Sequence, residues 1–290
     1  MPDQKEPPLQ RSEHPARDRS QRRLAGFLGL LAPIGMVLAG CANPARVPDA
    51  GETATLNVAS YNIKHGLGMD GVIDLERTAR VLESLDAEVI ALQEVDDRAR
   101  RSDGVDQAAW LGERLGMTHR FGAFMPFQGG RYGLALLTSL PITDHATWRL
   151  SDGNEPRVAL AVTLEARDGR AVTVIVVHFD WVDDDAFRFT QAEETIARLG
   201  TVETPWIVIG DFNDVPGSRT MNAFAECGSL LDKEPGNAAT FPSEDPRIDI
   251  DHVVTGPARS WPAGVISVID ERIASDHRPL RVGLLPPPER

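Results

Sequence analysis

Cysteine is rare in this sequence of 290 residues, which contains only Cys41 and Cys227. Two cysteines cannot build the disulfide framework that holds many small secreted domains together. Cys227 is therefore expected to pack as a small apolar side chain. The sequence also lacks a Gly-x-Ser-x-Gly motif and any internal repeat, so it shows neither a serine-nucleophile signature nor a repeat architecture.

No apolar run is long enough to cross a membrane comfortably. The longest covers residues 24–38, whereas a membrane-spanning helix needs about 20 apolar residues. Residues 1–23 before it are rich in proline and arginine, and the small residues Ala39 and Gly40 follow it. A basic segment, a short apolar segment and small residues at a cleavage site are typical of a secretory signal.

Leu38-Ala39-Gly40-Cys41 resembles the lipobox of bacterial lipoproteins. The resemblance implies a signal peptide over residues 1–40, cleavage before Cys41 and attachment of lipid to its thiol. Residues 41–53, with two prolines and no periodicity, are then expected to be a tether. The mature protein would be a monomer on a membrane of the cell envelope, facing outside the cytoplasm. The alternative is an ordinary signal peptide whose cleavage region happens to contain Cys41.

Positive charge is in deficit, with 30 Lys and Arg against 43 Asp and Glu. Residues 1–40 hold six of the former and four of the latter, which leaves the mature chain with a net charge of −15. A charge of this sign opposes binding to nucleic-acid backbones and anionic membrane surfaces outside any local basic patch. It does not oppose the binding of cations.

The remainder of the chain, residues 54–286, alternates between helical and strand patterns without an internal linker. Helical periodicity or capping predicts helices near residues 74–85, 106–115, 183–199 and 221–226. Short apolar runs bounded by Gly, Pro, Asn and Asp predict strands near residues 56–61, 89–93, 119–124, 134–138, 147–150, 157–164, 172–177, 207–209 and 265–269. Residues 248–251 are expected to enter one more strand, and residues 275–280 lead into the last. We therefore expect one α+β domain in which helices flank two packed sheets.

The centre of this domain is expected at Ile207-Val208-Ile209-Gly210-Asp211-Phe212-Asn213. Three β-branched residues indicate a strand buried on both faces. The side chains of Asp211 and Asn213 follow two residues apart, and on an extended chain that spacing directs both to the same side. They could hold a water, a cation or a phosphoryl oxygen. The alternative is a simple turn, because Gly-Asp and Asn-Asp are common in turns.

The same kind of chemistry recurs where other apolar runs begin or end. Each such residue has an ordinary explanation as a turn residue, a surface charge or a hydrogen-bonded histidine, but their repetition points to one polar rim. The residues are Asn62, Glu94, His178, Asp211, Asn213, Asp249, Asp276 and His277. Clustered carboxylates need a proton or a cation to relieve their repulsion. An oxygen-rich set without thiolate suits Mg²⁺ or Mn²⁺ better than Zn²⁺.

Five segments, in this order along the chain, resemble the endonuclease/exonuclease/phosphatase superfamily, which includes DNase I-like nucleases, inositol phosphatases and neutral sphingomyelinases. They are Ser60-Tyr61-Asn62-Ile63, Leu92-Gln93-Glu94-Val95, Gly210-Asp211-Phe212-Asn213, Arg247-Ile248-Asp249 and Ser275-Asp276-His277-Arg278-Pro279-Leu280. Residues 133–138 and Glu155-Pro156-Arg157 are weaker landmarks. The resemblance implies a four-layered αββα sandwich that hydrolyses phosphoesters with Mg²⁺ or Mn²⁺.

The resemblance also implies roles for the candidate residues. Glu94 would be the main metal ligand, supported by Asn62 and Asp276. Asp211 and Asn213 would position the attacking water and the phosphoryl group. His277, oriented by Asp249, would act as a general base or stabilise developing charge, and His178 would lie near the scissile phosphate.

Two positions depart from the family pattern. Ile250 stands where many members carry an aromatic residue, and Lys64 stands where some nucleases have an acidic metal ligand. The second departure and the negative charge of the chain favour a small or lipid-borne phosphoester over long duplex DNA. The alternatives are a secreted DNase-like endonuclease and a binding lipoprotein that keeps the fold without turnover.

Overall fold

The computed structural model describes residues 55–287 except 237, 259 and 263. The predicted signal peptide over residues 1–40, the tether over residues 41–53 and the lipid-bearing Cys41 lie outside the described residues. In the ranges that are described, no helix is both long enough and apolar enough to cross a membrane.

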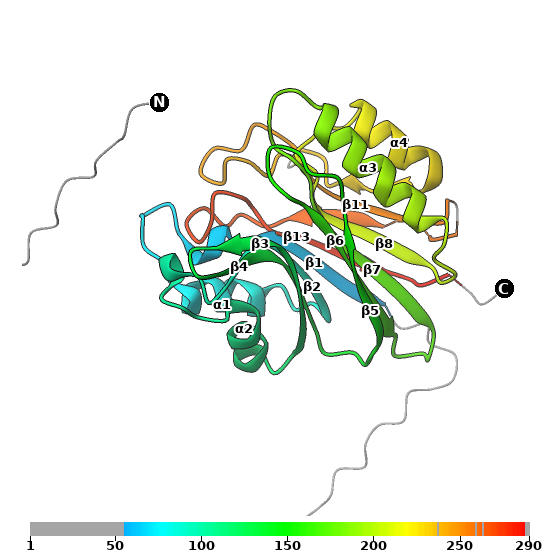
Figure 1. Ribbon diagram of the computed structural model, residues 1–290. Coiled ribbons are helices and arrows are strands. Elements are labelled where there is room, and N and C mark those ends of the chain that lie inside the picture. The colour runs from blue at the N-terminus through cyan, green and yellow to red at the C-terminus, as the bar shows by residue number, and fades with distance from the viewer. Residues whose placement is uncertain (1–54, 237, 259, 263, 288–290) are drawn as a thin grey trace, which may run out of the picture. The chain divides into compact units, whose positions relative to one another are not determined.

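Two β-sheets pack face to face, and a pair of helices covers the outer face of each (Figure 1). The first sheet has the strand order β10-β12-β13-β1-β2-β4-β3. Its strands are β1 (Leu56–Asn62), β2 (Val89–Asp97), β3 (Thr118–Phe127), β4 (Gly130–Thr138), β10 (Asp232–Lys233), β12 (Val265–Val268) and β13 (Leu280–Leu284). The second sheet has the order β5-β6-β7-β8-β11-β9. Its strands are β5 (Ile142–Arg149), β6 (Val158–Glu165), β7 (Ala171–His178), β8 (Trp206–Asp211), β9 (Ser229–Leu230) and β11 (Asp251–Gly256).

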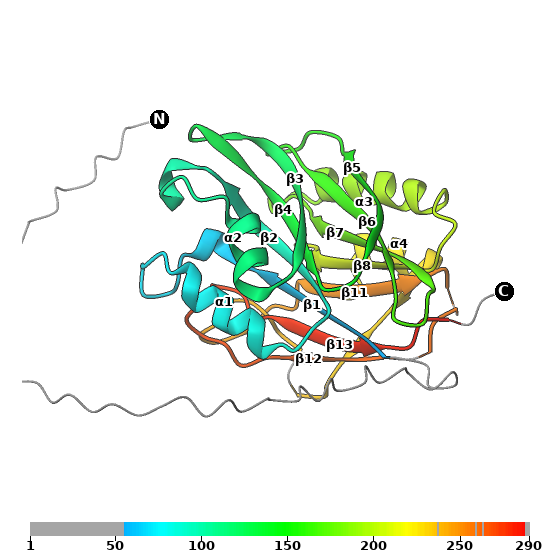
Figure 2. The same cartoon turned by 90° about the horizontal axis from the view of Figure 1, so that it is seen from below.

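The helices are α1 (Leu75–Ser84) and α2 (Gln107–Leu115) on the first sheet, and α3 (Ala186–Leu199) and α4 (Arg219–Cys227) on the second (Figure 2). Short 3₁₀ turns, η1 (Lys64–Gly66) and η2 (Arg100–Ser102), follow β1 and β2. The predicted α+β class and four-layered αββα sandwich are confirmed.

Alternation along the strands explains the layering. In β8, Ile207 and Ile209 enter the core between the sheets, while Val208 packs against the helix layer. In β1, Val58 faces the inter-sheet core and Tyr61 faces the helices. Because side chains of successive strand residues point to opposite faces, a run of apolar residues is what a strand covered on both sides requires. The predicted burial of β8 on both faces is therefore confirmed.

Helix starts follow the capping chemistry of the sequence. Oδ1 of Asp74 accepts a hydrogen bond from Arg77 N at 2.8 Å, and Oδ1 of Asp106 accepts one from Ala109 N at 3.1 Å. The third helix starts at Ala186 rather than at residue 183 as predicted. Asp184 accepts from Ala186 N, and aspartates that bind nearby backbone N–H groups favour positions before a helix over positions inside it.

Gly210 is required by the close approach of β7 to β8. Its φ is +145°, and a Cβ built on it would lie 2.1 Å from the carbonyl oxygen of Val177.

We predict that Gly210→Ala lowers the free energy of unfolding by about 2 kcal/mol or more, because the backbone strain and the steric clash add to each other. Gly169→Ala is the control, since Gly169 has a φ of +82° with no heavy atom within 4 Å of the added Cβ. Urea unfolding should show a loss of only about 1 kcal/mol for the control; equal losses would contradict the steric explanation.

Candidate functional site

The predicted site residues meet at one end of the sandwich because of strand direction. β1 runs parallel to β2, and β7 runs parallel to β8, so Asn62, His178 and Asp211 all end strands at the same side. β11 and β13 are antiparallel to β8 and β1 and therefore begin there. We call this side the pocket end; it lies on the left in Figures 1 and 2.

A β-bulge presents Glu94 at the pocket end. The pairing of β2 with β4 shifts register between Leu92 and Val95, and Glu94 has a φ of +58°. Bulges re-aim a side chain out of the regular alternation. Nδ2 of Asn62 lies 3.1 Å from Oε1 of Glu94 and 3.2 Å from Oδ2 of Asp211. The Asn62 amide therefore links a carboxylate of the first sheet to one of the second.

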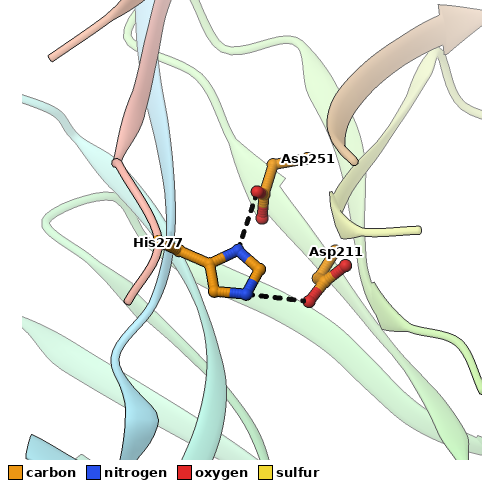
Figure 3. Close-up of side chains that lie close together, drawn as sticks. All are labelled: Asp211, Asp251 and His277. Carbon is orange, nitrogen blue, oxygen red and sulfur yellow. Dashed lines mark hydrogen bonds and ion pairs between the residues drawn. The ribbon is translucent and has the colours of Figure 1, made fainter. Parts of the chain in front are cut away.

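His277 lies between two carboxylates (Figure 3). Its Nδ1 donates to Oδ2 of Asp251 at 2.9 Å, and its Nε2 lies 3.6 Å from Oδ2 of Asp211. Burial disfavours the imidazolium, but the charges of Asp251 and Asp211 outweigh it and raise the pKa of His277 to about 10. Burial in turn raises the pKa of Asp211 to about 7 against the opposing effect of His277. The pair therefore favours a protonated His277 beside a carboxyl that can exchange a proton near neutral pH.

The prediction that Asp249 orients His277 is wrong, because Asp251 makes this contact. Asp249 instead accepts from the buried Lys233 ammonium, and its Oδ1 lies 3.7 Å from Nδ1 of His252. The sequence offers two Ile-Asp pairs two residues apart, at 248–249 and 250–251. Asp251 of the second pair begins the buried strand β11, just as the other site residues end or border their strands. This position was the signal in the sequence that could have identified it.

The corrected position also resolves the departure noted at Ile250. The residue that follows the histidine-bound aspartate is His252, whose ring packs edge-on against Phe212 with centroids 5.6 Å apart. An aromatic ring therefore does occupy this place.

His178 and Asn213 complete the wall around Asp211. Nε2 of His178 lies 3.5 Å from Oδ2 of Asp211, while its buried Nδ1 has no hydrogen-bond partner among the described residues. Burial, together with the charges of Arg157 and His277, holds the pKa of His178 well below its usual value. Asn213 has a left-handed conformation with a φ of +51°, and its backbone N–H donates to Oδ1 of Asp211 at 2.9 Å. Its Nδ2 donates to Phe179 O at 3.0 Å.

Lys64 is paired with one of the expected metal ligands. Its ammonium lies 2.7 Å from Oδ2 of Asp276, and its backbone N–H donates to Oδ1 of Asn62 at 3.1 Å. An internal cation therefore balances the Asp276 carboxylate, whereas the contact found for the Glu94 carboxylate is the neutral Asn62 amide.

These side chains surround a pocket of about 310 Å³, which is lined by Glu94, Tyr132, Glu155, Arg157, His178, Trp181, Asp211, Asn213, Phe241, Asp276 and His277. Asn62 and Asp251 lie behind this lining. Tyr132 on β4 and the loop residues Trp181 and Phe241 were not predicted, because nothing in an isolated aromatic residue indicates that it will face a pocket. A larger hollow, about 590 Å³, opens at the opposite end around Trp206 and Pro287, away from all eight predicted residues.

Arg157 is the main cationic group of the pocket lining. Its side chain is only 1% exposed, and one guanidinium nitrogen lies 3.1 Å from Oε2 of Glu155. The guanidinium also lies over the Phe124 ring, 4.9 Å from its centroid. Nε and a second terminal nitrogen are buried without a hydrogen-bond partner among the described residues. Buried donors left unpaired are costly, so this arginine is prepared to receive an acceptor such as a phosphate oxygen.

The oxygen donors of the pocket fit a hard divalent cation. The carboxylates of Glu94 and Asp276 line it, and Asn62 directs its amide nitrogen to Glu94 while its Oδ1 accepts from Lys64 N. Among the described residues, Asp211, Asp251 and His277 form a tighter group, with one oxygen or nitrogen atom of each within 4.8 Å of the others. Because Nδ1 of His277 is already committed to Asp251, we interpret this group as a proton-transfer chain rather than as a metal centre.

The fold and this site define a DNase I-like αββα protein. Residues 59–277 match the Endonuclease/Exonuclease/phosphatase family, and the chain belongs to that family. The family is generally hydrolytic and includes phosphatases and nucleases. The resemblance noted from the five sequence segments is thereby confirmed at the level of the family.

Solved structures share the fold at low sequence identity. An endonuclease/exonuclease/phosphatase from Beutenbergia cavernae is 24% identical over 80% of this chain and 72% of its own, with a TM-score of 0.66. A mannosyl-6-phosphatase from Bacteroides thetaiotaomicron is 22% identical over 79% of this chain and 99% of its own, with a TM-score of 0.64. The catalytic domain of human nocturnin with a bound sulfate anion is 22% identical over 79% and 94%, with a TM-score of 0.61.

Asp251 should control the proton affinity of His277. In buffer with EDTA, NMR titration should show that Asp251→Asn lowers the pKa of His277 by roughly one to three, whereas Asp249→Asn leaves it unchanged. The folded pKa of about 10 exceeds the ordinary 6.5. The protonated histidine therefore stabilises the fold below about pH 6.5, and this stabilisation is lost as the pH rises towards 10.

Between pH 6.5 and 10, the free energy of unfolding measured with urea should fall less steeply with pH for Asp251→Asn than for the wild type. A pKa of His277 that responds to Asp249→Asn and not to Asp251→Asn would overturn the assignment of the pair.

Proposed function

We propose that the protein is an exported, lipid-anchored phosphoesterase that depends on a divalent metal ion and hydrolyses a phosphodiester or phosphomonoester with an activated water. The observation that carries this proposal is the pocket itself. One wall presents carboxylates, another presents the His277–Asp251 pair, and a third presents the unpaired donors of Arg157. Family membership supports the reaction class.

Glu94 and Asp276, with Asn62, would hold Mg²⁺ or Mn²⁺. Such an ion supplies Lewis-acid stabilisation of negative charge on phosphoryl oxygens. Lys64 would keep Asp276 paired and oriented when the metal is absent, since its ammonium already lies 2.7 Å from that carboxylate. Carboxylate and amide oxygens are the ligands that such ions prefer.

The remaining side chains would position the reactants and move protons. Asp211, with Asn213 beside it, would hold the attacking water and accept its proton. His277, kept as an imidazolium by Asp251 and Asp211, would donate a hydrogen bond to a phosphoryl oxygen and stabilise charge that develops there. Arg157 would bind a second phosphoryl oxygen, and the neutral His178 would lie beside the scissile bond. Phosphoryl transfer depends mainly on positioning and electrostatic stabilisation of this kind.

The favoured substrate is a small or lipid-borne phosphoester rather than long duplex DNA. A pocket of about 310 Å³ suits a compact phosphorylated group. Two arginines that could contact a phosphate backbone are engaged with carboxylates, Arg131 with Asp97 and Arg278 with Asp270. Arg188 is buried against Asp214. Among the described residues, these three arginines are therefore occupied by carboxylates and not free to follow a nucleic-acid backbone.

Metal binding should be visible without a substrate. Mg²⁺ or Mn²⁺ should raise the melting temperature, because a ligand that binds only the folded state stabilises it by mass action. Glu94→Gln should reduce this shift, and Glu203→Gln, at the opposite end of the molecule, should not. Differential scanning fluorimetry with and without EDTA measures both. If the wild-type melting temperature does not respond to either metal, the metal site is wrongly assigned.

His277→Ala should separate catalysis from metal binding. Hydrolysis of bis-p-nitrophenyl phosphate should slow by roughly 10²–10⁴, the usual value of a proton-transfer or charge-stabilising group. The metal-induced melting shift should remain. His145→Ala, on the exposed edge strand β5, is the matched control and should keep wild-type turnover. Near-wild-type turnover of His277→Ala would refute the proposed role.

Lipid attachment at Cys41 can be tested in cells that export the full chain. The mature protein should begin at Cys41 and fractionate with membranes, and Cys41→Ser should release it or leave an uncleaved precursor. Mass spectrometry of the amino terminus decides between these outcomes and an ordinary signal peptide. An unmodified terminus at another residue would refute lipidation.

A further inference from the structure

Exposed apolar side chains are concentrated at the pocket end. Among the described residues, nine large hydrophobic side chains are exposed, and seven of them lie on loops or a helix start at this end. The other two, Val265 and Leu285, lie at the opposite end. Single exposed apolar residues are ordinary, but a concentration around one opening marks an interaction surface.

The first patch consists of Val72, Ile73 and Ile273. Val72 and Ile73 lie on the loop between η1 and α1, and Ile273 lies on the loop between β12 and β13. The two loops are joined by a hydrogen bond from Met69 N to Ile273 O at 2.8 Å. The second loop continues to Asp276 and His277 of the pocket, so this patch borders the site on one side.

The second patch consists of Trp181, Phe187 and Val215, and a buried arginine holds it in place. Trp181 lines the pocket and is still 58% exposed. A terminal nitrogen of Arg188 donates to the carbonyl groups on either side of Trp181, Asp180 O and Val182 O, both at 3.1 Å. Its Nε donates to Asp214 at 3.1 Å, which fixes the loop that carries Val215.

The carboxylate of Asp180 anchors the same loop from within. It is fully buried and accepts from the backbone N–H groups of Asn154 and Val182 at 2.6 and 3.2 Å. The loop that carries Trp181 is thus anchored by buried charged groups on both sides of the tryptophan, whose side chain stays exposed. A fixed, exposed indole beside a pocket is prepared to be buried by a partner.

Charge selects the kind of partner. Residues 179–185, which carry Trp181, contain four aspartates and no lysine or arginine, and Asp183 and Asp184 are exposed. Glu244 is exposed on the loop before β11, whereas Asp245 on that loop is paired with Arg247 and Asp185 is paired with Arg219, so the excess negative charge of this side of the rim comes from Asp183, Asp184 and Glu244. An acidic rim repels phosphate backbones and anionic lipids but attracts ammonium groups. Tryptophan beside such a rim suits the headgroup layer of a bilayer, where one side of the ring is apolar and the other is wet.

We propose that the pocket end docks on a zwitterionic phospholipid bilayer, with the first and second patches in the headgroup region on either side of the pocket. The exposed carboxylates then face the ammonium groups of phosphatidylcholine. The pocket opens onto the lipid surface, so the substrate class becomes the phosphoester of a lipid headgroup. This last step alone rests on the proposed phosphoesterase function.

Tryptophan fluorescence tests the docking directly. Trp206 and Trp261 are buried and Trp110 and Trp148 are half-buried, so Trp181 is the exposed tryptophan of the five in the chain. The full-length protein is mixed with phosphatidylcholine vesicles whose acyl chains carry bromine. Emission should shift to the blue and be quenched, and Trp181→Phe, which keeps an aromatic ring, should remove both effects. This readout reports on the pocket end whatever the amino-terminal residues contact.

Matched variants locate the surface. Val72→Ser, Ile73→Ser and Ile273→Ser together should raise the lipid concentration needed for half-maximal quenching by about tenfold or more. The control, Val265→Ser with Leu285→Ser, removes exposed apolar groups at the opposite end and should behave as the wild type. Turnover of soluble bis-p-nitrophenyl phosphate should be unchanged in both. Vesicles of phosphatidylglycerol should quench less than those of phosphatidylcholine.

Absence of bromine quenching at Trp181, or equal loss in the control, overturns the proposal. A blue shift that depends on protein concentration and not on vesicles also overturns it, in favour of contact between copies of the chain. Docking without hydrolysis of any phosphoester would refute the proposed function and leave the docking surface standing. Hydrolysis of soluble phosphoesters without quenching would refute the docking alone.

Discussion

The site depends on contacts that cross from one sheet to the other. His277 precedes a strand of the first sheet, and Asp251, to which it donates, begins a strand of the second. Asn62 of the first sheet reaches Asp211 of the second at 3.2 Å. Neither pair can form unless the inner faces of the sheets pack in one relative position. That position is set by the apolar core between them, which includes Val58, Leu136 and Ile207. Because interiors are close-packed, a small slip between the sheets would separate these polar groups.

Placing several carboxylates at one seam has an electrostatic cost, and the structure offsets it in three ways. Lys64 neutralises Asp276, the imidazolium of His277 faces both Asp211 and Asp251, and the buried Lys233 is paired with Asp249 behind them. Within the described part of the chain Glu94 forms no ion pair, and its direct contact is the Asn62 amide, which leaves it available to a metal ion. Lys64 stands where some nucleases have an acidic ligand, and its ammonium already neutralises Asp276. The pocket therefore needs less positive charge from a bound cation, and the other site residues keep their positions.

The residues that hold the Trp181 loop in place are different from those that line the pocket. The Trp181 loop is fixed by Arg188 and Asp180, neither of which lines the pocket. Loops that carry functional side chains must hold them against the entropy of a free chain. Buried charged groups satisfied by backbone carbonyl and N–H groups achieve this here. Such loops vary in length and sequence more readily than the strands beneath them, so one scaffold can serve different phosphoesters.

The sequence by itself determined the layers of the fold and most of the site. Its apolar runs marked the buried strands. Asn62, Glu94, His178, Asp211 and His277 could be recognised because each ends or borders such a run, and strand direction then brings them together. Local spacing failed at Asp249, because two Ile-Asp pairs satisfy the same pattern and only the pairing of β11 with β8 shows which aspartate reaches His277.

The tertiary structure alone decided the contacts of Lys64, Arg157 and Trp181. The residues that they contact are distant in sequence or lie on loops, and the path of a loop cannot be predicted from hydrophobic periodicity. Alternation and strand ends are local properties of a chain, whereas the approach of one loop to another is set by the packing of both sheets.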